Sequence, residues 1–192
     1  MFKKIGIAIL TLFAMVVFFG TLSQALFHSS PSDLTVPRAH ADTVIANHPV
    51  ELYVPALNIS ARVQSVGITA SGKMAVPTNY TDVGWYKYGT MPGKIGSAVI
   101  AGHVDDGLAL PGVFAHLDEL KPGDDVFVAT SDGHTLHFIV TGSQAYAKDA
   151  DASSVFNDTS NRTLRLITCT GTWLPTQGTH DQRLVVTAVL QS

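Results

Sequence analysis

The sequence predicts a mainly β domain that follows a single apolar segment at the N-terminus. Seven short runs rich in β-branched residues lie between residues 50 and 190, and turn sequences separate them. Helical patterns in this region are few and short, at residues 113–120 and 152–156. Many short strands separated by turns are typical of an antiparallel barrel or sandwich.

Residues 5–22 are predicted to form a transmembrane signal-anchor. Fourteen of these eighteen residues are apolar, and no Asp, Glu, Lys or Arg occurs between Lys4 and Asp33. As a helix the segment would span roughly 27 Å, close to the hydrocarbon thickness of a bilayer. Lys3 and Lys4 precede it, so residues 1–4 are expected to stay cytoplasmic, with the rest of this single-pass chain outside the cell membrane.

Whether the anchor is cleaved stays open at this stage. Ser23-Gln24-Ala25 and Ala39-His40-Ala41 both have the small-x-small pattern of a signal-peptidase site. The nearly spanning length of the apolar segment favours an uncleaved anchor. Residues 23–49 carry serines and prolines without an apolar period, which is typical of a linker or stalk.

Residues 50–192 have the composition of an ordinary globular domain. They hold nine basic and thirteen acidic residues, a net charge of minus four. This charge provides no basic surface for nucleic acid. In chain order, the predicted strands cover residues 50–54, 61–67, 97–101, 125–129, 135–140, 163–169 and 184–190. The turn sequences between them include Ser71-Gly72, Pro92-Gly93, Pro122-Gly123 and Asp132-Gly133.

The chain has one cysteine, Cys169, at the end of a predicted strand. A single cysteine makes no internal disulfide and no cysteine-rich zinc site. Most free cysteines are small buried hydrophobic residues. However, a strand end that opens onto a loop presents a side chain to substrate, and an unpaired thiol outside the cell is prone to oxidation. Cys169 is therefore either core filler or a nucleophile.

A cysteine nucleophile needs a proton partner, and His103 is the best-placed of eight histidines. His28, His40 and His48 lie in the predicted linker, and His116, His134 and His137 in a turn or hairpin. His103 directly follows the buried-type strand 97–101 and Gly102, so it also lies where a core strand ends. On its own, a histidine at this position is more often structural than catalytic.

Arg183 is the candidate that would stabilise an oxyanion. It opens the last predicted strand, fourteen residues after Cys169. If these two strands pair as a hairpin, Arg183 returns beside Cys169. Arg165 shares the face of Cys169, but four residues along a strand is about 13 Å, too far for Arg165 to touch what the sulfur attacks.

The segments around these residues resemble those of the sortases, which are cysteine transpeptidases of Gram-positive cell surfaces. The resemblance is strongest to the group usually called class F. The matching segments are Ala101-Gly102-His103-Val104-Asp105, Leu166-Ile167-Thr168-Cys169, Arg183, and Trp85-Tyr86 with Pro92-Gly93. Arg165 stands where the family signature has a threonine. The resemblance covers residues 50–190.

The resemblance implies an eight-stranded β-barrel and a two-step acyl transfer. Cys169 would attack the threonine carbonyl of a Leu-Pro-x-Thr-Gly-like (LPxTG-like) C-terminal signal on secreted proteins, forming a thioester. His103 would act as general acid and base, and Arg183 would hold the oxyanion and substrate backbone. Thr168 and His180 are further candidates for substrate contact. The acceptor would be an amine of a cell-wall precursor.

The resemblance implies no metal or organic cofactor. Some sortases are activated by calcium, and Asp149, Asp151 and Asp158 precede the cysteine strand, but they form no recognisable site. Two alternatives remain: a sortase-like surface scaffold, or a mainly hydrolytic cysteine peptidase. A peptidoglycan L,D-transpeptidase is disfavoured because its Ser-His-Gly-Cys type signature is absent.

Overall fold

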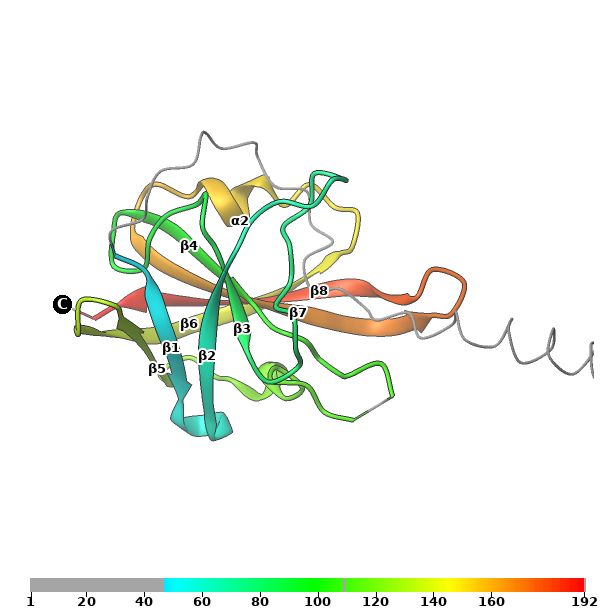
Figure 1. Ribbon diagram of the computed structural model, residues 1–192, viewed down its shortest axis with the longest axis horizontal. Coiled ribbons are helices and arrows are strands. Elements are labelled where there is room, and N and C mark those ends of the chain that lie inside the picture. The colour runs from blue at the N-terminus through cyan, green and yellow to red at the C-terminus, as the bar shows by residue number, and fades with distance from the viewer. Residues whose placement is uncertain (1–46, 109, 192) are drawn as a thin grey trace, which may run out of the picture.

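The computed structural model describes residues 47–108 and 110–191, which form a closed β-barrel (Figure 1). The strands are β1 (Pro49–Val54), β2 (Ile59–Val66), β3 (Val83–Tyr86), β4 (Gly96–Ala101), β5 (Asp125–Thr130), β6 (Thr135–Ala147), β7 (Arg162–Leu174) and β8 (Thr179–Leu190). Around the barrel they follow the order β1-β2-β3-β4-β7-β8-β6-β5. The short helices are η2 (Pro55–Leu57), η3 (Leu117–Glu119) and α2 (Ser153–Asn157). A mainly β, eight-stranded barrel with short helices is thus confirmed.

Alternating side chains fill the barrel and leave a second apolar layer on its outer wall. Leu164 and Leu166 of β7 belong to the interior cluster with Val186 of β8. Ile167 and Val185, on the opposite face of the same two strands, pack in a separate cluster. That cluster also contains residues of α2, so this part of the wall is covered. All six residues of β4 are buried, as expected for a strand with apolar layers on both faces.

The structure adds one strand that the sequence patterns did not predict and lengthens three others. β3 has only four residues, Val-Gly-Trp-Tyr, all of them buried, so it shows no alternation of apolar and polar side chains. β6 runs on to Ala147, β7 runs on to Leu174, and β8 begins at Thr179. The helical pattern at residues 113–120 is mostly turns, with η3 at its end.

The extensions of β7 and β8 form a hairpin that projects from the barrel (Figure 1). Its polar side chains break the apolar alternation on which a strand prediction depends. The predicted cytoplasmic residues 1–4, the transmembrane segment 5–22 and most of the linker 23–49 lie outside the described residues. Within residues 47–108 and 110–191, no helix has the length and apolar character needed to cross a bilayer.

Candidate active site

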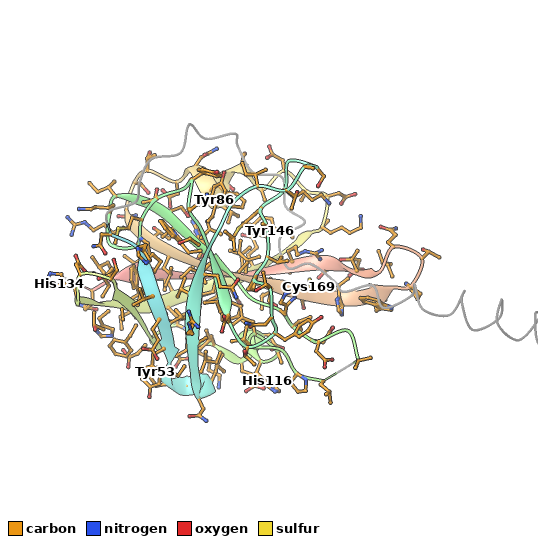
Figure 2. All side chains as sticks on the ribbon, viewed as in Figure 1. Tyr53, Tyr86, His116, His134, Tyr146 and Cys169 are labelled. Carbon is orange, nitrogen blue, oxygen red and sulfur yellow. The ribbon has the colours of Figure 1, made fainter. Side chains whose placement is uncertain are left out.

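Cys169 and Arg183 face each other across the pairing of β7 with β8. The two strands are antiparallel, and the Cα atoms of Cys169 and Arg183 are direct partners in the register. Side chains of directly opposed residues lie on the same face of the sheet, with Cβ atoms about 5 Å apart. Cys169 lies where the β7–β8 hairpin leaves the barrel (Figure 2).

The parallel pairing of β4 with β7 places His103 beside Cys169, on the side away from Arg183. Ala101 is the register partner of Ile167. Side chains along a strand point to the same face at every second residue, so the next residues on this face are His103, after β4, and Cys169, in β7. The N–H of Gly102 donates to the carbonyl of Ile167 at 3.0 Å, which continues the pairing beyond the end of β4.

The three candidate residues therefore form a row across three neighbouring strands. β4, β7 and β8 are adjacent in the barrel; His103 directly follows the end of β4 and Gly102, and Cys169 and Arg183 lie in β7 and β8. All three side chains are nearly enclosed, with exposed fractions of 5%, 1% and 0%. The row shares its face with Ile167 and Val185 of the outer apolar cluster.

Thr168 locks the two strand ends together. Its hydroxyl donates to the carbonyl of Gly102 at 2.9 Å. With the Gly102–Ile167 hydrogen bond, this contact ties the residue before His103 to the residue before Cys169. The structure thus assigns Thr168 a positioning contact. Thr168 also lines the pocket at Cys169, so the predicted substrate contact stays a prediction.

The imidazole of His103 is held by the segment between β2 and β3. Its Nε2 lies 3.2 Å from the carbonyl oxygen of Pro77. The ring of Tyr80 packs against it, with ring centroids 5.0 Å apart. The sequence patterns gave no reason to select Pro77 or Tyr80, because neither lies near a predicted strand end.

The guanidinium of Arg183 is fixed by the hairpin from which it projects. Nη1 donates to the carbonyl oxygens of Gln182 and His180, at 2.7 and 3.0 Å. Nη2 donates to the hydroxyl of Thr179 at 2.8 Å. A guanidinium is a planar fork of donors, so these contacts set its direction beside Cys169.

A pocket of about 160 Å³ opens onto Cys169. Its walls include Thr168, Gly171 and His180 from β7 and β8, and Ala115 and Asp118 from the segment that contains η3. His103 does not line this pocket. A larger pocket of about 450 Å³ lies between β1, β2, β5 and β6, and none of the predicted site residues lines it.

His180 is the second predicted substrate-contact residue, and the structure places it at the pocket of Cys169. Its ring meets that of Trp173 edge-on, with centroids 5.3 Å apart. Burial lowers the pKa of His180 below the ordinary value, and the nearby Arg183 cation lowers it further, whereas Asp105 and Asp181 oppose the shift. These effects favour the neutral imidazole.

Four other histidines of the described residues do not line the pocket at Cys169. His116 pairs with Glu119 at 2.9 Å on the surface, and His137 pairs with Asp125 at 2.6 Å. His134 lies in the turn between β5 and β6, at the opposite end of the molecule from the hairpin (Figure 2). His48 lies beside that turn, where its carbonyl accepts the N–H of Ser131, and His28 and His40 fall outside the described residues.

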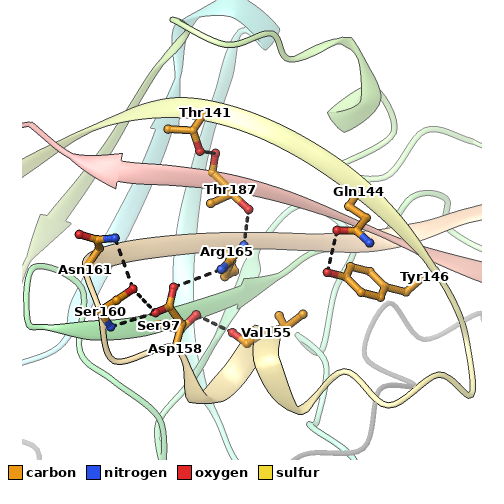
Figure 3. A network of polar contacts seen from close by, with 10 residues as sticks. All are labelled: Ser97, Thr141, Gln144, Tyr146, Val155, Asp158, Ser160, Asn161, Arg165 and Thr187. Atoms are coloured by element: carbon orange, nitrogen blue, oxygen red, sulfur yellow. Dashed lines mark hydrogen bonds and ion pairs between the residues drawn. The ribbon is translucent and has the colours of Figure 1, made fainter.

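Arg165 belongs to a separate polar network (Figure 3). It donates to the hydroxyl of Thr187 on β8 and to the carboxylate of Asp158, the latter at 3.4 Å. Hydrogen bonds from Ser160, with the nearby Arg165 cation, lower the pKa of Asp158. Arg165 thus fixes the segment that leads into β7.

Two of the three acidic residues before β7, Asp151 and Asp158, accept hydrogen bonds from nearby residues. Asp151 accepts the N–H of Ser153 at 2.9 Å, and Asp158 accepts from Ser160 and Arg165. In the described part of the chain, no group of three or more histidine, cysteine, aspartate or glutamate side chains is arranged to hold a metal ion.

The family model of the sortase domain matches residues 52–191. The chain belongs to the sortase family. Sortases are enzymes, cysteine transpeptidases, so the match settles the class of chemistry and leaves the class F subgroup unassigned. No sequence among the curated proteins matches the chain.

Solved sortase structures share this fold. A lid mutant of sortase A from Corynebacterium diphtheriae has a TM-score of 0.57 at 20% identity, over 80% of this chain and 73% of that one. Sortase C-1 from Actinomyces oris has a TM-score of 0.55 at 24% identity, over 74% and 72%. Streptococcus agalactiae sortase C1, solved in complex with MTSET, has a TM-score of 0.57 at 20% identity, over 74% and 66%.

Gly112 is a residue of the sortase site that the sequence patterns did not reveal. A Cβ atom at this position would lie 2.4 Å from the carbonyl oxygen of His103 and 3.1 Å from the backbone nitrogen of Asp105. The N–H of Gly112 donates to the carbonyl of Val104 at 2.9 Å, and Phe114 N–H donates to that of His103. Only glycine therefore lets this loop lie against the backbone of His103.

Gly112→Ala is expected to displace His103 and lower kcat/KM for peptide cleavage by at least about tenfold, since small displacements of catalytic groups are costly. The matched control is Gly142→Ala on β6, where a new Cβ would meet nothing within 4 Å. Peptide cleavage and thermal unfolding are measured for both variants. Equal activity of the two would show that the Gly112 contact does not position His103.

Proposed function

We propose that this sortase is a membrane-anchored transpeptidase that cleaves an LPxTG-like sorting signal between threonine and glycine. The acyl group passes to Cys169 as a thioester and then to an amine of a cell-wall precursor. The observation that carries the proposal is the row of His103, Cys169 and Arg183 on adjacent strands. The resemblance of these segments to class F sortases supports it further.

In the first step the thiolate of Cys169 attacks the threonine carbonyl carbon. The thiolate is the reactive form of cysteine, and neighbouring cationic side chains favour it. Arg183, directly opposite in the register, donates to the carbonyl oxygen as negative charge develops there. His103 protonates the departing glycine amine, so that the C–N bond breaks and the thioester remains.

In the second step an amine replaces the sulfur. His103, now neutral, removes a proton from the incoming amine as nitrogen attacks the thioester carbon. The new amide bond forms, the C–S bond breaks, and Cys169 leaves as the thiolate. The chemistry uses only side chains of this chain, and we propose no cofactor.

The membrane location rests on the sequence of residues 5–22. A sorting signal followed by an apolar tail would be held in the same membrane, so a tethered enzyme would meet it at short range. The proposed partners are accordingly secreted proteins with such a C-terminal signal, and the catalytic domain is proposed to lie outside the cell.

Arg183→Lys is expected to lower kcat/KM by about 10²- to 10³-fold, the usual cost of losing a donor to an oxyanion. Lysine keeps the charge, but it cannot make the forked contacts to Thr179, His180 and Gln182. Arg165→Lys is the control, because its network lies away from Cys169 (Figure 3). Equal losses in the two variants would contradict the assignment of Arg183.

The proposal is tested with the full chain, a peptide library built on Leu-Pro-x-Thr-Gly, and a set of candidate amines. Mass spectrometry of the products identifies the cleaved bond and whether amine or water receives the acyl group. We expect cleavage after threonine and an amide product. Products formed only with water would indicate a hydrolytic peptidase. A library left intact, with Cys169 reactive only after unfolding, would indicate a scaffold.

A further inference from the structure

A second pocket adjoins the one that opens onto Cys169. It has a volume of about 370 Å³, and its walls are Asp105, Gly107, Leu108, Trp173 and His180. His180 lines both pockets. The two pockets therefore meet at His180, and the mechanism above does not use the second one.

The walls of the second pocket suit an organic cation. Asp105 contributes a carboxylate that is partly exposed, and its Oδ1 accepts the N–H of Gly107 at 2.9 Å. Trp173 is 39% exposed and Leu108 is 65% exposed, which offers an aromatic face and an aliphatic side chain beside that carboxylate. Carboxylates pair with ammonium groups, and aromatic faces attract them.

None of the described residues that line this pocket is a lysine or arginine that would offset the negative charge of Asp105. Arg183, the nearest cation on the hairpin, is fully buried and does not line the pocket. Burial and the Arg183 charge lower the pKa of His180, which keeps its ring neutral. The carboxylate of Asp105 therefore makes the electrostatic potential of the pocket negative.

We propose that the pocket of Asp105, Trp173 and His180 binds the acceptor amine as an alkylammonium ion before it attacks the thioester. Asp105 pairs with the charge, and Trp173 packs against the alkyl chain. This inference rests on the proposed transpeptidase function and specifies its acceptor: a primary amine on an aliphatic chain, as in the side chain of a diamino acid.

Transfer of the acyl group from Cys169 to the bound amine forms one C–N bond and breaks one C–S bond. The bound ammonium loses one proton to the neutral imidazole of His103, and its nitrogen attacks the thioester carbonyl carbon. The C–N bond forms, the C–S bond breaks, and the electron pair of that bond returns to Cys169 as the thiolate. The second proton leaves the nitrogen to solvent, which yields the amide and restores the imidazolium–thiolate pair.

The kinetic test compares Asp105→Asn with Asp106→Asn in the full chain. Each asparagine keeps the oxygen that accepts loop N–H groups, and Asp106 does not line the pocket. Propylamine, cationic near neutral pH, and hydroxylamine, neutral there, serve as acceptors. We expect Asp105→Asn to raise the KM for propylamine about fivefold, the effect of one partly exposed ion pair. The KM for hydroxylamine should not rise, and Asp106→Asn should leave both KM values and the hydrolysis rate unchanged.

Equal KM values for propylamine in the two variants, or an equal rise with hydroxylamine, would overturn the proposal. A binding measurement keeps the pocket testable apart from turnover. Of the two tryptophans, Trp85 is buried and Trp173 is exposed, so fluorescence of the Cys169→Ala chain should report amine binding at Trp173. A saturable change with propylamine, weakened by Asp105→Asn, supports the pocket even where no transfer is found. Its absence overturns the pocket while leaving the cleavage function standing.

Discussion

Cys169→Ala is expected to abolish peptide cleavage and amine transfer. Cys169 is the only thiol of the chain, and the strand register places it between His103 and Arg183. Alanine has no nucleophile, and no neighbouring group replaces the covalent step. Release of the glycine-containing fragment from an LPxTG-like peptide measures the loss.

The loss should occur without unfolding. Cys169 is buried, and alanine removes a single sulfur atom, a change that costs far less than a large cavity in the core. Thermal unfolding of the variant should therefore stay within a few degrees of that of the original chain. Cleavage at an undiminished rate by a folded Cys169→Ala chain would exclude Cys169 as the nucleophile.

His103→Gln is expected to lower kcat/KM by about 10²- to 10⁴-fold, the usual contribution of a general acid–base group. Glutamine places an amide nitrogen near the position of Nε2, so the contact with the Pro77 carbonyl can persist. The amide cannot accept and return a proton at neutral pH. Steady-state cleavage, with thermal unfolding as a check on folding, measures the effect.

His116→Gln is the matched control for His103→Gln. Its side chain is 65% exposed and pairs with Glu119 at the surface, so its replacement should leave cleavage unchanged. A His103→Gln chain with the activity of the His116→Gln chain would show that the imidazole of His103 takes no part in proton transfer. A loss in both variants would point to a general effect of the substitution.

The sequence predicted the strands that alternate in polarity, and with them the position of the row. β4 ends two residues before His103, Cys169 lies in β7 where its buried part ends, and the pairing of β7 with β8 places Arg183 opposite Cys169. The register that aligns His103 with Cys169 comes from parallel strands more than sixty residues apart. No local pattern determines such a long-range register.

Other parts of the site arise from contacts that leave no periodic signal. β3 is buried on both faces. A Cβ atom added at Gly84 would lie only 3.0 Å from the side chain of Val66. Pro77 and Tyr80 hold His103 from a segment without regular secondary structure. These contacts depend on tertiary packing, which sequence periodicity does not encode.

The most direct test of the central claim is the intact mass of the full chain during turnover of an LPxTG-like peptide. With no amine added, the mass should rise by that of the peptide fragment ending in threonine less one water, as a thioester requires, and fragmentation should place the adduct on Cys169. Hydroxylamine should remove the adduct and return the peptide as its hydroxamate. Cleavage of the peptide with no adduct on Cys169, or with an adduct on another residue, would contradict the account.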